Sequence, residues 1–167
     1  MSLSIYTASA PVLIRYLSNL KAILEKAQAF CEQKKIEPSV LLNSRLAPDM
    51  YPLTAQIQLA SDMAKSCLSR LAGTEVPSFP DTETTFAELY ARIDKTVAHI
   101  KTFKPEQIDN SEARKVSVRG GDKTFEMDGQ SYLSFFLLPN FFFHVTNAYA
   151  IMRHNGVSLG KMDYLGG

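Results

Sequence analysis

The sequence lacks an excess of charge of either sign. Its 167 residues carry 18 Lys and Arg against 17 Asp and Glu, which gives a formal net charge of +1. A basic surface field attracts the phosphates of nucleic acids, and this composition provides none. We therefore expect no nucleic acid among the partners of this protein.

The sequence is also poor in cysteine and has no long unbroken apolar run. Cys31 and Cys67 form neither a CxxC pair nor a metal-ligand spacing, so we interpret both as reduced thiols of the core. Residues 1–20 lack the basic and apolar regions of a secretion signal, and no segment approaches the roughly 18 apolar residues of a membrane span. These absences predict a cytoplasmic protein with no membrane partner.

Several sequence motifs of enzymes are missing as well. There is no GxSxG motif, no P-loop and no glycine pattern of a dinucleotide site, and we interpret Gly120-Gly121 as a turn. The hydrophobic residues make up 46% of the chain, which is enough to bury a core without disulfides or metals. We expect one domain that covers residues 1–167.

Apolar residues recur at steps of three and four in several segments, as in amphipathic helices. The predicted helices cover about residues 13–31, 53–71, 86–103 and 137–153. Pro11 either occupies the first turn of the first helix or kinks it, and Gly73 is well placed to end the second. Thr85 and Glu88 have the spacing of a capping box. The last helix is apolar on nearly every side, which predicts that it is the most buried element.

The apolar period changes to two between Arg114 and Met127, on either side of Gly120-Gly121-Asp122. This pattern predicts a β-hairpin over about residues 114–127, and a two-stranded hairpin needs to lean on the helices. Residues 34–50 hold at most one helical turn, and residues 131–138 are either helical or extended. The predicted fold class is an all-α four-helix bundle with a short β-hairpin inserted before the last helix.

This order of elements and the closing stretch LPNFFFHVTNAYAIMRHNG, residues 138–156, resemble the DinB/YfiT-like superfamily. More narrowly, the chain is similar to an uncharacterised branch of that superfamily, a family of unknown function. Other segments that carry the resemblance are residues 2–6, 46–53, 56–62, 83–89 and 159–165. The resemblance covers nearly the whole chain and implies the DinB-like bundle.

The resemblance also implies a metal site, from which this sequence departs. Better-understood members hold a divalent metal with three histidines, one from the second helix and an HxxxH pair from the last, and several transfer a low-molecular-weight thiol or isomerise a thiol adduct. His144 matches the first histidine of the pair, but Ala148 stands at the second position and the second helix contains no histidine. The usual three-histidine site is therefore incomplete. A zinc or nickel ion held by His144, Asp62 and a glutamine is the remaining metal hypothesis.

His144 is the centre of the candidate small-molecule site. It is either a neutral buried imidazole with one hydrogen-bond partner, or a ligand or general base that faces the bundle interior. The other candidates are polar residues of the two helices expected to face each other, and a tyrosine near the end of that pair: Asn147, Gln56, Gln58, Asp62 and Tyr51. These polar groups form either a structural network or a ligand site. For Tyr51 we favour packing over donation of its phenol to a ligand.

Two function hypotheses follow from the residues and the resemblance. The first is a DinB-like domain that binds or transforms a small molecule around His144. The alternative is a non-enzymatic homodimeric bundle with a stress-related binding or scaffolding role, in which leftover apolar helix surface forms the dimer contact. Of the other histidines, we interpret His99 as a solvated surface residue and His154 as a cap of the last helix.

Overall fold

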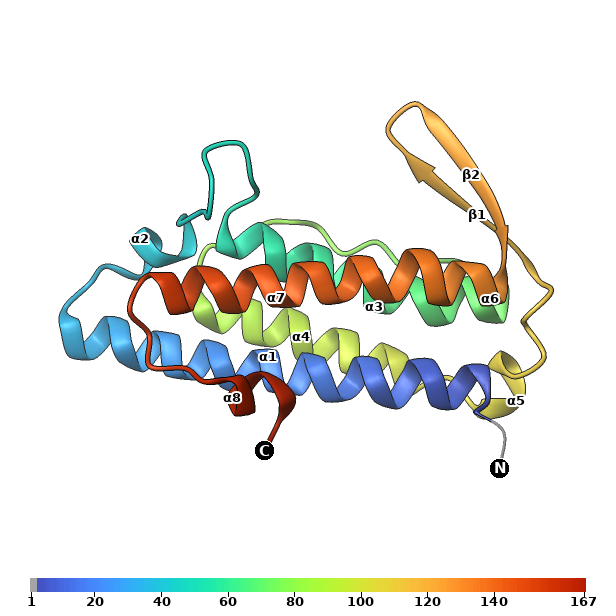
Figure 1. Cartoon of the computed structure of the whole chain (residues 1–167), viewed down its shortest axis with the longest axis horizontal. Helices are drawn as coiled ribbons and strands as arrows, with labels where there is room; N and C mark the ends of the chain where they lie inside the picture. The colour runs from blue at the N-terminus through green and yellow to red at the C-terminus, as the bar shows by residue number, and fades with distance from the viewer. Residues whose placement is uncertain (1–2) are drawn as a thin grey trace.

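The structure, a computed structural model, describes residues 3–167. Within that range four long helices lie side by side (Figure 1): α1 (Ile5–Lys34), α3 (Leu53–Ala72), α4 (Phe86–Ile100) and α7 (Leu138–His154). Helix α3 packs against both α4 and α7, and α1 packs mainly against α4. The predicted four-helix bundle is confirmed.

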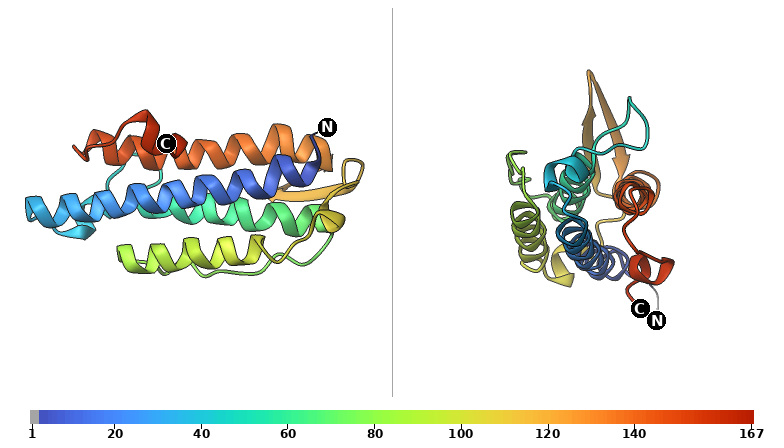
Figure 2. Two further views of the ribbon diagram at one scale, coloured as in Figure 1. Left: turned by 90° about the horizontal axis from the view of Figure 1, so that it is seen from below. Right: turned by 90° about the vertical axis from the view of Figure 1, so that its left-hand side faces the viewer.

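Short helical segments connect and extend the bundle. They are α2 (Pro38–Leu42), α5 (Pro105–Ile108), α6 (Gly129–Ser131), the π-helix η1 (Tyr132–Leu137) and α8 (Lys161–Leu165). Helix α2 is the single turn that the sequence allowed in the first connection. Helix α8 packs against α1, and the right-hand view of Figure 2 shows it beside that helix, on the side away from α4. Neither α5 nor α8 was predicted, because helices of four or five residues are too short to show an apolar period.

The ends of the long helices follow local sequence signals. Ser4 caps α1 by accepting a hydrogen bond from the backbone N–H of Thr7, so Pro11 lies inside this helix rather than in its first turn. Gly73 ends α3 with a left-handed φ of 72°, as predicted. Thr85 and Glu88 form the predicted capping box of α4.

Helices α6, η1 and α7 join into one continuous helix from Gly129 to His154. The π-type turn ends at Leu138, whose backbone N–H donates to the carbonyl of Leu133, five residues earlier. Pro139 follows directly, and it has no N–H with which to continue the α-helical pattern. Residues 131–138, for which the sequence left two alternatives, are therefore helical.

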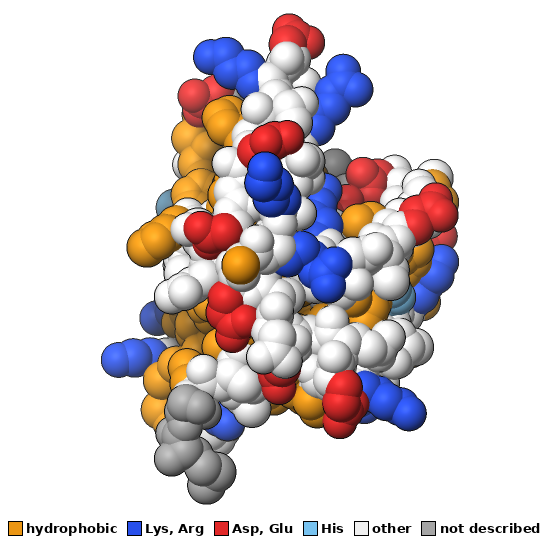
Figure 3. All heavy atoms as spheres, turned by 90° about the vertical axis from the view of Figure 1, so that its right-hand side faces the viewer, with side chains coloured by type: hydrophobic (Ala, Val, Ile, Leu, Met, Phe, Trp, Pro, Cys, Tyr) orange, Lys and Arg blue, Asp and Glu red, His pale blue; other side chains and the backbone are white. Residues whose placement is uncertain are grey.

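The hairpin consists of β1 (Lys115–Gly120) and β2 (Lys123–Asp128), paired antiparallel with Val116 opposite Met127. It matches the prediction for residues 114–127. Val116 and Val118 are buried, so the base of the hairpin leans on the rest of the protein as expected. Beyond its base the hairpin projects away from the bundle (Figure 1), and Figure 3 shows charged side chains of both signs scattered over this end of the molecule.

The prediction that the last helix is the most buried element is wrong. Thirteen of the 20 residues of α3 are buried, compared with six of the 17 in α7. Helix α7 contacts α3 and α1, so one side of the continuous helix stays open, where Phe135 is 81% and Phe143 is 56% exposed. An apolar helix surface is thus left uncovered by the chain itself.

The continuous helix Gly129–His154 contradicts the prediction that no segment is apolar enough to span a membrane. It is 26 residues long and, by length and composition alone, apolar enough to cross a bilayer. In the structure its buried side packs against α3 and α1. Such packing is typical of a core helix in a bundle, which passes the same test of composition.

Candidate functional site

The candidate site forms where α3 and α7 meet. The Nδ1 atom of His144 on α7 lies 2.8 Å from Oε1 of Gln56 on α3. The imidazole is partly buried, and this burial lowers the pKa of His144 below its ordinary value of 6.5. Its Nε2 atom has no hydrogen-bond partner among residues 3–167. His144 is therefore neutral near pH 7 and keeps one ring nitrogen available.

Asn147 lies one helical turn beyond His144. Its side chain is only 9% exposed, and its Nδ2 atom is buried without a hydrogen-bond partner in the described part of the chain. Burying an amide N–H without a partner costs about 1–3 kcal/mol. Residues three apart on a helix have Cβ atoms roughly 5–6 Å from each other, so the side chains of His144 and Asn147 are neighbours on α7.

Tyr51 contributes to this site through its backbone rather than its phenol. Its carbonyl accepts a hydrogen bond of 3.1 Å from Nε2 of Gln56. The residue is 61% exposed, so the interpretation of its ring as a packing group is wrong. Pro52 is the N-cap residue of α3, so the carbonyl of Tyr51 lies directly before the first turn of the helix.

Gln58 and Asp62 do not join His144, contrary to the grouping predicted from the sequence. They lie about 200° and about 240° around α3 from Gln56, because each helical residue turns by about 100°. Nε2 of Gln58 donates to Glu83 at 2.9 Å, and Oδ1 of Asp62 accepts from Arg92 at 2.9 Å. Both residues thus face the α4 side of α3.

Arg92 organises this second polar cluster. Its guanidinium side chain is almost fully buried and pairs with three carboxylates at 2.8–2.9 Å: Asp62, Asp81 and Glu83. Two of these carboxylates come from the loop between α3 and α4, so the cluster fixes that loop to the bundle. Desolvation raises the pKa of Glu83, but hydrogen bonds from Arg92 and Gln58 outweigh it and leave that pKa below its usual 4.5.

The donor set does not fit the three-histidine metal site of the superfamily. Gln56, on the facing helix, accepts a hydrogen bond from His144, and Asp62 pairs with Arg92 and with Lys65. Over residues 3–167, no group of three or more His, Cys, Asp or Glu side chains is arranged to hold a metal ion. Asp62 faces Arg92 and Lys65, so it does not lie with His144 and Gln56 as the predicted ligand set requires.

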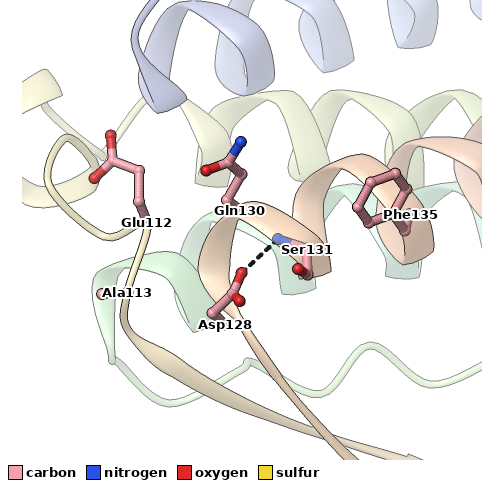
Figure 4. A pocket seen from close by; sticks show the side chains of 6 residues that line it. All are labelled: Glu112, Ala113, Asp128, Gln130, Ser131 and Phe135. Carbon is pink, nitrogen blue, oxygen red and sulfur yellow. Dashed lines mark hydrogen bonds between the residues drawn. The ribbon is translucent and has the colours of Figure 1, made fainter.

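Five pockets of the surface are lined by residues other than His144, Asn147 and Gln56. An open pocket of about 410 Å³ at the hairpin end is lined by Glu112, Ala113, Asp128, Gln130, Ser131 and Phe135 (Figure 4). There the Asp128 carboxylate accepts from the backbone N–H of Ser131 at 2.7 Å, which makes it a helix cap. From Gln130 to His144 the helix rises by about 20 Å, so the two sites are separate.

The remaining histidines and cysteines have structural surroundings. His99 is partly buried and shares a hydrogen bond of 3.0 Å with the hydroxyl of Ser69, so its prediction as a solvated residue is wrong. His154 is exposed, and the carbonyl of Ile151 in the last turn of α7 accepts from the side chain of Asn155 instead. Cys31 and Cys67 are free and buried, as predicted.

Sequence reasoning missed Arg92 and Glu83. Arg92 falls on the buried side of the α4 helix, one position before Ile93, and Glu83 lies two residues before the N-cap Thr85. A basic residue at a buried helical position was the available signal, because buried arginines need carboxylate partners.

The comparisons with known proteins agree with this architecture. The chain resembles a crystal structure of a DinB family member protein from Shewanella denitrificans, with 39% sequence identity over 97% of this chain and 92% of that chain, and a TM-score of 0.88. The fold is therefore that of the DinB-like helical bundles. Residues 5–165 match the family described as a domain of unknown function, DUF1993, and the chain belongs to that family. The search of curated proteins found no match.

Proposed function

We propose that this protein binds a small neutral molecule at the contact of α3 and α7, against His144 and Asn147. The observation that carries the proposal is the unpartnered, buried Nδ2 of Asn147 one turn from a histidine with a free ring nitrogen. A ligand that accepts a hydrogen bond from Asn147 removes the cost of the buried, unpaired N–H. The free, buried cysteines are consistent with action in the reducing cytoplasm.

The Asn147→Leu variant tests this proposal. We expect the midpoint of urea unfolding to stay unchanged or to rise, because an unpaired polar group is replaced by an apolar one of similar size. We also expect binding of small neutral amides and alcohols, followed by amide chemical shifts of residues near 144–147 in the full chain, to be lost.

A matched control is Asn140→Leu on the same helix, since the side chain of Asn140 already donates to the carbonyl of Phe136. This variant should lose stability and keep binding. A loss of stability in Asn147→Leu, together with no ligand-dependent shifts in the unmodified protein, would mean that Asn147 is only a structural residue.

A second candidate function is the homodimeric bundle with a stress-related binding or scaffolding role. The observation that favours it is the exposure of Phe135 and Phe143 on the open side of the continuous helix. From Tyr132 to Met152 the sequence contains no Asp, Glu, Lys or Arg. Two copies of an uncharged surface can meet about a two-fold axis without repulsion between like charges.

A further inference from the structure

The hydrogen bonds around Gln56 define the direction of its side-chain amide. The Nε2 of Gln56 lies 3.1 Å from the carbonyl oxygen of Tyr51, which can only accept. The amide nitrogen must therefore point to Tyr51, and Oε1 must point to the imidazole of His144 at 2.8 Å. An amide oxygen also only accepts, so the proton of this second hydrogen bond belongs to Nδ1 of His144.

A neutral imidazole carries one proton, so a proton on Nδ1 leaves a lone pair on Nε2. In a neutral histidine exposed to water the two tautomers exchange. In His144 the Nδ1–H tautomer has a fixed acceptor, which is Oε1 of Gln56. We propose that Gln56 is a positioning residue that holds His144 as the Nδ1–H tautomer, so that the site takes a ligand with a hydrogen-bond donor against Nε2 and an acceptor against Asn147. The ligand part rests on the proposed function, and the tautomer part does not.

A primary amide has the donor and acceptor that this pair requires. Its N–H donates to Nε2 of His144, and its carbonyl accepts from Nδ2 of Asn147. Burial disfavours the charged imidazolium, which would present a second donor in place of the lone pair. The ring of Phe143 lies next to the imidazole, with 5.4 Å between the ring centroids, and offers an apolar surface to the remainder of such a ligand. Benzamide combines these features and is a suitable probe.

The tautomer is tested by long-range ¹H–¹⁵N correlation spectra of the full chain at a mildly alkaline pH. The chain has three histidines, so the His144→Gln spectrum assigns the resonances of His144. We expect a protonated Nδ1 and an unprotonated Nε2 in the unmodified protein. In Gln56→Leu, His144 should become a mixture of tautomers, whereas Gln56→Glu, which still accepts from Nδ1, should keep the original one.

His99 and His154 act as internal controls, and Gln33→Leu at an exposed site of α1 is the control variant. The resonances of His99 and His154 should stay unchanged in Gln56→Leu. Gln33→Leu should leave the tautomer of His144 unchanged. A protonated Nε2 in the unmodified protein, or an unchanged tautomer in Gln56→Leu, would overturn the positioning role of Gln56 whatever the protein binds.

The ligand class is tested by comparing benzamide with N,N-dimethylbenzamide, which keeps the acceptor but has no N–H. Benzamide should bind at least about fivefold more tightly, as one hydrogen bond of about 1 kcal/mol implies. In Gln56→Leu this preference should fall towards one. Equal binding of the two probes, or preferential uptake of Zn²⁺ at Nε2, would contradict the ligand class. If neither probe binds while the tautomer is as stated, the proposed function fails and the positioning role stands.

Discussion

Arg92 is the most strongly buried charged residue in the described part of the chain, at 3% exposure. Its three carboxylate partners lie on α3 and on the loop before α4, so its ion pairs connect segments that are up to 30 residues apart in sequence. Removing charged groups from water costs free energy, and the attraction between the Arg92 guanidinium and its carboxylates offsets that cost. Without the guanidinium, the desolvation of the carboxylates is no longer offset. The stability of the loop therefore depends on a single side chain.

Replacing Arg92 with Leu should lower the free energy of unfolding by up to about 3–5 kcal/mol, because it leaves the largely buried Glu83 and the partly exposed Asp62 without their cation. Urea unfolding measures this loss. The matched control is Lys21→Leu, which removes a more exposed ion pair with Asp94 at 2.7 Å and should cost no more than about 1 kcal/mol. Similar, small losses in both variants would show that the cluster is no more than a surface ion pair.

The same variant should change the response to acid. The folded-state pKa of Glu83 lies below its usual 4.5, so Glu83 adds stability above that pH, and the contribution is lost as the pH falls through the lower, folded-state pKa. Without Arg92 this lowering of the pKa weakens. Stability of Arg92→Leu should consequently decline less steeply than that of the unmodified protein below about pH 4.5.

The prediction of site residues succeeded and failed for the same geometric reason. Gln56 and His144 meet because each lies on the side of its helix that faces the other. Gln58 and Asp62 were grouped with them only because they share a helix, and the rotation of about 100° per residue turns them to the α4 side. The resemblance to a histidine-metal superfamily pointed to His144, but only coordinates could show which polar residue lies opposite that side chain.

At the scale of the helix, local signals were predictable and packing effects were not. The capping box of Thr85 and Glu88 depends on residues three apart, so the sequence alone indicates it. The π-type turn forms where η1 continues into α7, just before Pro139. The short helix α8 packs against α1, which is distant in sequence. The sequence therefore left residues 131–138 open and did not predict α8.

The Thr85→Ala variant should destabilise the protein by about 1 kcal/mol, because its side chain accepts from the backbone N–H of Glu88 at the first turn of α4. Thermal or urea unfolding measures the change. Thr82→Ala is the control, since Thr82 is exposed in the preceding loop, and it should stay within about 0.5 kcal/mol of the unmodified protein. An equal effect of both changes would argue against the cap.

At the scale of the whole molecule, the order of helices and the hairpin were predicted, but their relative burial was not. Periodicity shows which side of a helix is apolar, and it does not show how many neighbours cover that side. In the bundle α3 has neighbours on two sides, α4 and α7, which is why it is more buried than the more apolar α7. The excess apolar surface of α7 is then available to a partner.

If the open side of the continuous helix binds a second copy of the chain, light scattering should give a mass of twice the 18.6 kDa of the chain. Phe135→Asp places a charge at 81% exposure in that uncharged surface, so the mass should fall to that of one chain while the helical content is kept. Val40→Asp, at 62% exposure on α2, is the matched control and should leave the dimer intact. A single-chain mass for the unmodified protein would mean that the chain forms no dimer. A dimer in Phe135→Asp would mean that the dimer contact lies elsewhere.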